Sequence, residues 1–183
     1  MEFVTLSVED VGELLTLQRA AYVTEAQAHD DVNLPPLMQS LDELASELTE
    51  PGVTAFGLRN GSLRLVAAVR VHLSPTDPHT AELGRLVVAP DMQGRGWGSR
   101  LHELAEARLP EQVTDLQLFT GERSLGNLRL YSRFGYRETH RTPTPGGYSL
   151  VHLTKRVREQ PDAVVTPPPP CGGGESALSA GGL

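Results

Sequence analysis

A strand, a glycine-rich turn and a helix follow one another in the middle of this chain and constrain its fold more than any other segment. Residues 83–88 are apolar and end in two valines, which is typical of a mostly buried strand. Three glycines then follow at every second position: Gly94, Gly96 and Gly98. From Trp97 the apolar residues recur with a helical period until Pro110. The segment predicts a strand that leads through a glycine turn into a helix.

This geometry favours a phosphate or pyrophosphate as ligand. Several backbone N–H groups and the positive end of the helix point at one place. Glycine suits the turn because side chains would block the ligand and because some positions need a positive φ. The spacing Gly-x-Gly-x-Gly differs from the Gly-x-Gly-x-x-Gly of dinucleotide-binding folds, and the turn lacks the lysine of a P-loop.

The composition indicates one globular domain. The 183 residues can bury a sizeable core, and 39% are hydrophobic and 21% charged. A net charge of −7 argues against non-specific nucleic-acid binding and is compatible with a cationic or amine substrate. Cys171 is the single cysteine, which excludes an intramolecular disulfide. The sequence shows no signal peptide and no apolar run of about 20 residues, so we expect a cytoplasmic protein without a membrane span.

The N-terminal half predicts two helices and a hairpin. Capping boxes at Ser7 and Ser40 mark the two helix starts. The segment between them, 24–39, is expected to be irregular, and the two helices either frame a pocket or only pack. Residues 53–73 predict a β-hairpin around Asn60-Gly61, in which Arg64, Arg70 and His72 share a face that we expect to be partly solvated.

The C-terminal half predicts a strand near 116–119, a helix that begins after Ser124 and ends at Gly135, and two strands over 136–140 and 148–157. From Glu159 the chain becomes rich in Pro and Gly and should not pack. We therefore expect a domain over 1–158 and a flexible tail over 159–183.

Two motifs resemble the GNAT superfamily of acyl-CoA-dependent N-acyltransferases. The segment 93–98, Gln-Gly-Arg-Gly-Trp-Gly, is similar to its acyl-CoA pyrophosphate loop, and 130–136, Leu-Tyr-Ser-Arg-Phe-Gly-Tyr, is similar to its second signature. The motifs lie within 80–157, whereas 3–73 agrees in element order only. The resemblance implies an α/β (α+β) fold with a central mixed, mostly antiparallel sheet flanked by about four helices.

The resemblance also implies an N-acetyltransferase that uses acetyl-CoA as co-substrate. The acceptor would be an amine of a small molecule or peptide. We expect neither a nucleic acid nor a membrane as partner, and the protein could form a homodimer. No cysteine lies in the expected domain, so direct transfer in a ternary complex is favoured over a covalent intermediate. We expect no metal, because His102-Glu103 lacks the second histidine of a zinc motif.

The resemblance assigns the binding of acetyl-CoA to backbone and loop positions. The pantetheine arm would lie along the strand residues Leu86, Val87 and Val88. The pyrophosphate would lie against the turn: Gln93, Gly94, Arg95, Gly96, Trp97, Gly98 and Ser99. Many members carry an asparagine seven residues before the signature tyrosine, where this chain has Ser124; Asn127, four residues before it, is the candidate for a pantetheine contact here.

Two residues are candidates for proton transfer. Glu82, at the head of the central strand, could accept the proton of the amine, because an alkyl amine with a pKa of about 10.4 is mostly protonated at neutral pH. It could equally be a solvated carboxylate at a strand edge. The resemblance implies that Tyr131 is the general acid that protonates the leaving thiolate. It could instead be a core tyrosine.

Two other functions stay open at this stage. The first is a sensor or scaffold that binds acyl-CoA without turnover. The second is an enzyme that uses the glycine turn for ATP or NAD.

Overall fold

Residues 1–158 are described by the computed structural model. They form seven strands, five helices and two short 3₁₀ turns, Val8–Asp10 and Pro90–Met92. In chain order the elements are β1 (Glu2–Leu6), α1 (Val11–His29), α2 (Pro35–Met38), α3 (Leu41–Thr49), β2 (Val53–Arg59), β3 (Leu65–Leu73), β4 (Thr80–Val88), α4 (Trp97–Glu106), β5 (Asp115–Gly121), α5 (Leu125–Arg133), β6 (Arg137–Pro143) and β7 (Ser149–Arg156).

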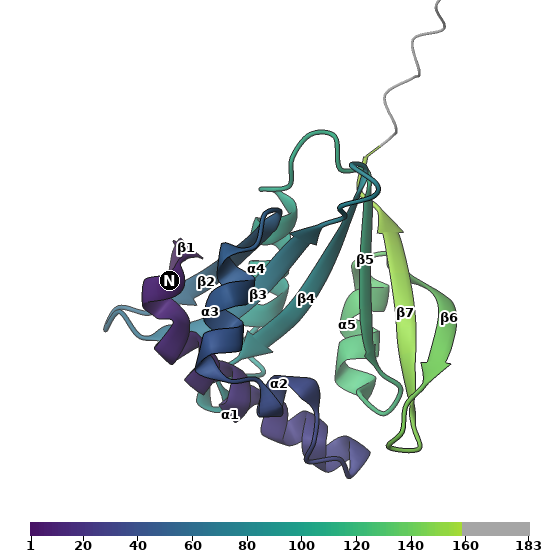
Figure 1. The fold of residues 1–183 in the computed structure, drawn as a ribbon, viewed down its shortest axis with the longest axis horizontal. Helices are drawn as coiled ribbons and strands as arrows, with labels where there is room; N and C mark the ends of the chain where they lie inside the picture. The colour runs from purple at the N-terminus through teal and green to yellow at the C-terminus, as the bar shows by residue number, and fades with distance from the viewer. Residues whose placement is uncertain (159–183) are drawn as a thin grey trace, which may run out of the picture.

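The strands form a single sheet in the order β1-β2-β3-β4-β5-β7-β6 (Figure 1). Neighbouring strands are antiparallel except β4 and β5, which are parallel. The crossover that links this parallel pair contains α4, as a connection between parallel strands requires. The mixed, mostly antiparallel sheet confirms the predicted fold class.

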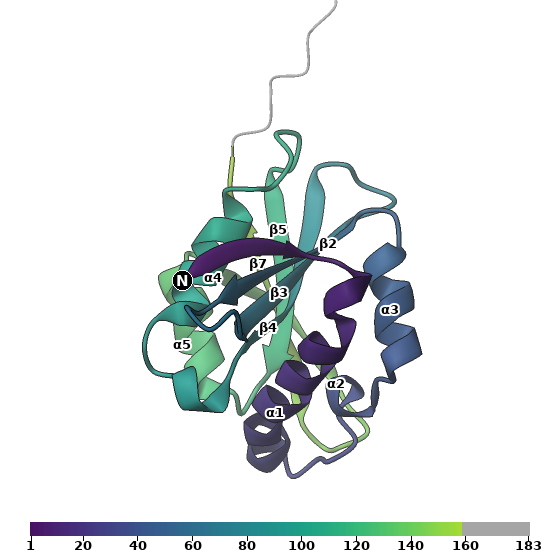
Figure 2. The same ribbon diagram turned by 90° about the vertical axis from the view of Figure 1, so that its left-hand side faces the viewer.

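Helices cover both faces of the sheet (Figure 2). The helices α4 and α5 lie on one face, where Leu101 and Leu116 belong to the larger core cluster. The helices α1 and α3 lie on the other, where Leu14 and Leu44 belong to a second cluster. Fully burying one such side chain contributes about 1.5–3 kcal/mol, so both layers hold the sheet in place.

Both predicted capping boxes are present. At the start of α3 the Ser40 N–H donates to Glu43 Oε2 at 2.7 Å, and the Glu43 N–H donates to Ser40 Oγ at 3.2 Å. The Ser7 N–H donates to Asp10 Oδ2 at 2.9 Å ahead of α1. These contacts satisfy N–H groups that have no acceptor inside the helix.

The prediction of an irregular segment over 24–39 is wrong in part. The helix α1 continues to His29, and a single further turn, α2, follows at Pro35–Met38. His29 is only 3% exposed, and its ring packs against Tyr148 with 4.4 Å between ring centroids. The Arg123 N–H donates to His29 Nε2 at 3.3 Å. These long-range contacts hold the last turns of α1, and no local pattern predicts them.

The predicted hairpin is present with a longer connection than expected. Strand β3 begins at Leu65, so the loop covers residues 60–64. Asn60 Oδ1 accepts the N–H groups of Ser62 and Arg64, both at 3.0 Å. The asparagine thus organises the turn through its side chain, as Asn does in many tight loops.

The expectation that Arg70 is partly solvated is wrong. Arg70 is 1% exposed; its guanidinium donates to Glu47 Oε2 at 2.8 Å and also to Gln18 Oε1. Gln18 lies on α1 and Glu47 on α3, so the helices supply the polar partners that water would otherwise provide. Burial by itself raises the pKa of Glu47, but the hydrogen bond from His72 and the charge of Arg70 outweigh it and lower that pKa to about 2.

The predicted tail, 159–183, lies outside the described residues, as does Cys171, and the domain boundary stays a prediction. Within 1–158 there is no helix with the length and apolar character that a bilayer crossing needs.

The contact between α1 and β5 generates a stability prediction. A Cβ added at Gly121 would lie 2.1 Å from His29 Nε2, and the buried ring cannot move aside without breaking its contacts. We expect Gly121→Ala to destabilise the protein by about 1–3 kcal/mol in urea unfolding. Gly126→Ala in α5, where a Cβ meets nothing within 4 Å, is the control and should be neutral or stabilising. Equal stability of the two variants would contradict the tight packing of α1 on β5.

Candidate functional site

The parallel pairing of β4 with β5 is very short. It runs from Thr80 opposite Asp115 to Glu82 opposite Gln117, and beyond this point the two strands diverge (Figure 1). Strand β4 continues to Val88 with β3 as its hydrogen-bonded neighbour. Over this stretch the other edge of β4 has no partner strand within the described residues. An unpaired edge of this kind can bind an extended ligand through its backbone groups.

Residues 86–88, which we predicted to contact the pantetheine arm, form the end of β4 beside this gap. A bulge precedes them: the register with β3 shifts between Ala68 and Arg70, and Arg85 adopts φ 53°. A bulge bends a strand and increases its twist. Here it accompanies the divergence of β4 from β5. Val87 is buried, and Leu86 and Val88 are half-buried.

The glycine turn has the predicted conformation. Gly94 and Gly96 adopt φ of +72° and +80°, and a Cβ at either position would meet no atom within 4 Å. Gly96 is the N-cap of α4 and provides no side-chain cap. The first-turn N–H groups of α4, from Trp97 to Ser99, therefore have no acceptor inside the helix, and neither Gly94 nor Gly96 adds a side chain to the turn. The turn can hold an anionic group.

The other predicted side chains of the turn contact protein atoms. Gln93 Nε2 donates to the Val88 carbonyl at 3.1 Å, and the Arg95 guanidinium donates to the Asp91 carbonyl at 3.2 Å. The first contact holds the turn against the end of β4, and the second lies within the segment that follows β4. Trp97 packs against the larger core cluster, as expected of a core anchor.

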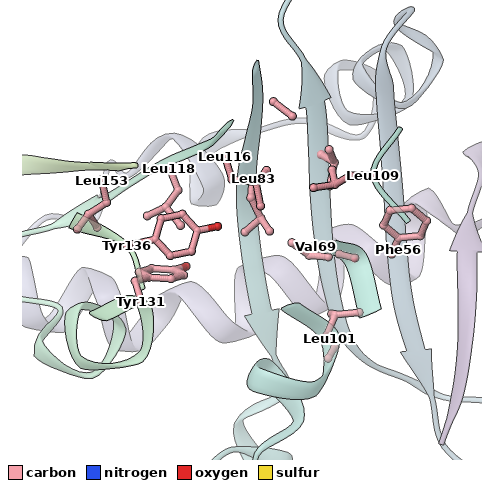
Figure 3. Close-up of a cluster of buried hydrophobic side chains, with 14 of the residues drawn as sticks. Phe56, Val69, Leu83, Leu101, Leu109, Leu116, Leu118, Tyr131, Tyr136 and Leu153 are labelled. Atoms are coloured by element: carbon pink, nitrogen blue, oxygen red, sulfur yellow. The ribbon is translucent and has the colours of Figure 1, made fainter. Parts of the chain in front are cut away.

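Tyr131 lies on α5, on the face of the sheet that α4 and α5 cover. It is 7% exposed, and its ring packs edge-on against Tyr136 with 5.6 Å between centroids. Figure 3 shows the two rings next to each other, between Leu83 of β4 and Leu153 of β7. Burial raises the pKa of Tyr131, and Tyr22 and Glu25 raise it further. The phenol is protonated at neutral pH, as a phenol with an ordinary pKa of about 10 also is.

Tyr22 and Glu25 belong to α1, which lies on the opposite face of the sheet from Tyr131. Both nevertheless raise the pKa of Tyr131 through their charge. The sequence analysis missed both residues. Glu25 lies in the segment predicted to be irregular, and no motif marks it.

Glu25 also organises the start of α5. Asn127 Nδ2 donates to Glu25 Oε1 at 3.1 Å and to Thr120 Oγ1 at 3.4 Å, and the Ser124 hydroxyl donates to Glu25 Oε2. Ser124 is the N-cap of α5, as predicted, but its side chain makes no cap bond. Its hydroxyl contacts α1 instead. Asn127, the candidate for the pantetheine contact, lies near the gap with its N–H groups directed to protein acceptors.

Glu82 lies on the α1 face of β4, at the last residue pair before the gap, and is exposed. Its neighbour opposite on β3 is His72, whose Nε2 lies 3.3 Å from Glu47 Oε1. The Glu47 carboxylate thus contacts both His72 and the buried Arg70. Glu82 and Tyr131 thus lie on opposite faces of the sheet, Glu82 at the last residue pair before the gap and Tyr131 in the larger core cluster.

A cavity of about 170 Å³ extends from Glu82 over β5, β7 and β6. Its lining residues are Glu82, Gln117, Leu118, Phe119, Thr139, His140, His152, Leu153 and Thr154. The sequence analysis named only Glu82 among them. The others lie on strands that the sequence predicts, but no local pattern shows which strands are neighbours in the sheet.

A second cavity, of about 390 Å³, lies between α4 and β7 around Glu106 and Lys155. It contains none of the predicted site residues. Within 1–158 no three His, Cys, Asp or Glu side chains are grouped so that they could hold a metal ion.

Comparison with known proteins identifies the family. The model of the acetyltransferase (GNAT) family matches residues 14–136. A search of curated proteins finds no match.

Solved acetyltransferases share the fold. The ribosomal-protein-S18-alanine N-acetyltransferase from Escherichia coli has 19% sequence identity and a TM-score of 0.70, over 88% of this chain and 96% of that one. The spermidine N-acetyltransferase from Vibrio cholerae, in complex with CoA and spermine, has 14% identity and a TM-score of 0.67, over 85% and 94%. An acetyltransferase from Thermus thermophilus has 18% identity and a TM-score of 0.65, over 85% and 96%.

At these identities the solved structures establish the fold alone. The family model, in contrast, spans more than half of the chain and includes both the glycine turn and Tyr131. The chain belongs to the acetyltransferase (GNAT) family.

Proposed function

We propose that this protein transfers the acetyl group of acetyl-CoA directly to an amine of a small molecule or peptide in a ternary complex. Family membership supports acetyl-CoA as the donor. The observation that carries the proposal is the gap between β4 and β5, which leaves the 86–88 edge of β4 without a partner strand and has the exposed Glu82 at the last residue pair before it. A cytoplasmic location and a homodimer remain expectations from the sequence.

The residues around the gap fit acetyl-CoA, which supplies the thioester and its thiol leaving group. The N–H groups from Gly94 to Ser99 would hold the pyrophosphate, because they lie at the N-terminus of α4, where the first-turn N–H groups have no acceptor inside the helix. The backbone of 86–88 would pair with the pantetheine amides. Asn127 has its N–H groups engaged, which leaves Oδ1 to accept an amide N–H.

Glu82 is the proposed base. The acceptor amine has a pKa of about 10.4 in water and must lose a proton before it attacks the thioester carbon. The Glu82 carboxylate is exposed at the end of the paired stretch of β4 and can take this proton directly or through one water. The exposed position also lets it exchange protons with solvent.

Tyr131 is the proposed acid. When the amide forms and the carbon–sulfur bond breaks, the thiolate requires a proton. A phenol with a pKa of about 10 already carries its proton at neutral pH, and burial raises the pKa of Tyr131 further. The proton taken by Glu82 and the proton given by Tyr131 balance over one turnover once solvent restores both groups.

Two solved neighbours support an amine acceptor. One is named as an N-acetyltransferase of a ribosomal-protein alanine and another as an N-acetyltransferase of spermidine. The experiment that tests the proposal measures thiol release from acetyl-CoA with a panel of amines and amino-terminal peptides. Binding of acetyl-CoA without thiol release from any amine would favour a non-catalytic sensor. Thermal stabilisation by ATP or NAD, and not by acetyl-CoA, would favour a nucleotide-binding enzyme.

The glycine turn generates the first prediction for this function. Gly96→Asp places a carboxylate where a pyrophosphate is expected, so we expect acetyl-CoA affinity to fall about 10²-fold or more in calorimetric titration. Gly135→Asp is the control, because Gly135 has a similar φ of +85° and is equally open but caps α5. If both variants bind acetyl-CoA like the wild type, the turn does not hold the pyrophosphate.

The second prediction concerns the acid. Tyr131→Phe keeps the ring and removes the hydroxyl, so kcat should fall about 10²-fold while acetyl-CoA affinity changes little. Tyr136→Phe is the matched control in the same cluster; it loses the contact with His102 Nε2 at 3.1 Å and should affect stability more than kcat. Wild-type turnover of a folded Tyr131→Phe variant would assign Tyr131 to the core alone.

The third prediction concerns the base. Glu82→Gln should lower the rate at neutral pH by about 10²–10⁴-fold and leave acetyl-CoA binding intact. Raising the pH increases the neutral fraction of the amine, so the difference from wild type should narrow at high pH. Glu50→Gln, an exposed carboxylate beyond α3, should behave like the wild type throughout. Parallel pH profiles with similar rates would show that Glu82 is not the base.

A further inference from the structure

The cavity beside Glu82 is built on the face of the sheet that α1 covers only in part. Two rows of side chains cross the strands there. In one row Glu82 lies opposite Gln117, which lies opposite Thr154; in the other Phe119 lies opposite His152, and His152 opposite His140. Neighbouring strands are about 4.8 Å apart, so β4 and β7 are separated by about 10 Å. The cavity thus has a carboxylate at one end and three aromatic rings at the other.

The aromatic end is held in a defined arrangement. The rings of His140 and His152 are stacked, with 4.1 Å between centroids and 8° between planes. Phe119 lies beside them, with its centroid 5.7 Å from that of His152. Thr142 Oγ1 lies 2.9 Å from His152 Nε2, which orients the imidazole. Three neighbouring rings of this kind form a surface that suits a planar group.

The exposure of Phe119 is unusual for its type. It is 43% exposed and lies on the opposite face of β5 from its buried neighbours Leu118 and Thr120. This aromatic side chain exposes apolar area to water, and a ligand that covered it would regain that free energy.

The charge of the cavity is confined to one residue. Glu82 is the single carboxylate among its lining residues, and no Lys or Arg is found among them. Burial and the neighbouring His140 lower the pKa of His152, so this imidazole is mostly neutral at pH 7. The lining therefore matches one cationic group next to Glu82 and an uncharged group beyond it. A long polycation would find no second carboxylate in this lining.

The size of the cavity sets a further limit. Its volume is about 170 Å³, below the roughly 300–1,000 Å³ of typical ligand pockets, which favours a small acceptor.

We propose that the acceptor is a primary amine joined by a short linker to a single aromatic or similarly planar ring, with the ring against Phe119, His140 and His152 and the amine at Glu82. This inference rests on the proposed function, because it places the reacting nitrogen beside the proposed base. It assigns Phe119 and His152 to acceptor specificity.

The test compares four amines as acceptors: 2-phenylethylamine, its saturated analogue 2-cyclohexylethylamine, n-hexylamine and spermidine. We expect kcat/KM for 2-phenylethylamine to exceed that for each of the others by about tenfold. Phe119→Leu should remove most of this preference through KM, because the apolar volume stays and the ring is lost. His152→Gln should do the same. Phe3→Leu, on β1 at the other edge of the sheet, is the matched control and should keep the preference.

Calorimetric titration of 2-phenylethylamine into the CoA-bound protein separates the two proposals. Turnover of aliphatic amines at equal or higher kcat/KM, or an unchanged preference in Phe119→Leu, would overturn the aromatic acceptor and leave acetyl transfer intact. Absence of turnover with every amine would overturn the proposed function. If no amine is turned over, the titration still tests the ring site. Binding of 2-phenylethylamine to the wild type that is about tenfold weaker in Phe119→Leu would support the site, and absence of binding would overturn the aromatic acceptor.

Discussion

The short parallel contact between β4 and β5 is the constraint on which the rest of the site depends. The two strands share three residue pairs, and Arg85 then takes a left-handed conformation at a bulge while β4 remains paired with β3. Had the ladder continued, the backbone of 86–88 would be satisfied by β5 and the gap would be closed. Because it stops at Glu82, an unpaired strand edge and a carboxylate lie next to each other.

A buried polar network keeps the α1 face of the sheet open at this place. Arg70 on β3 binds Gln18 of α1 and Glu47 of α3, and Glu47 also holds His72 next to Glu82. A buried ion pair is costly to desolvate, and removing one partner typically costs about 3–5 kcal/mol. The network thus fixes the positions of both helices, and α3 and the start of α1 lie over β2 and β3 rather than over β5.

The far end of α1 has a different anchor. Glu25 binds Ser124 and Asn127 at the start of α5, and His29 packs on Gly121 and Tyr148. These contacts connect the helix that borders the acceptor side with the helix that carries Tyr131. The ring-lined cavity lies between this anchor and Glu82, so its shape depends on elements that are far apart in the sequence.

The sequence by itself determined the local features of this protein. Glycine at 94 and 96 specifies the left-handed turn, Ser40 and Glu43 specify a helix start, and the motifs around Trp97 and Tyr131 indicated the family, because each depends on residues a few positions apart. The tertiary structure alone decided that Arg70 is buried, that α1 continues to His29 and Glu25 contacts the start of α5, and that Phe119, His140 and His152 line one cavity with Glu82. Such contacts join strands and helices whose adjacency arises from the packing of the whole sheet, and no pattern within one segment contains that information.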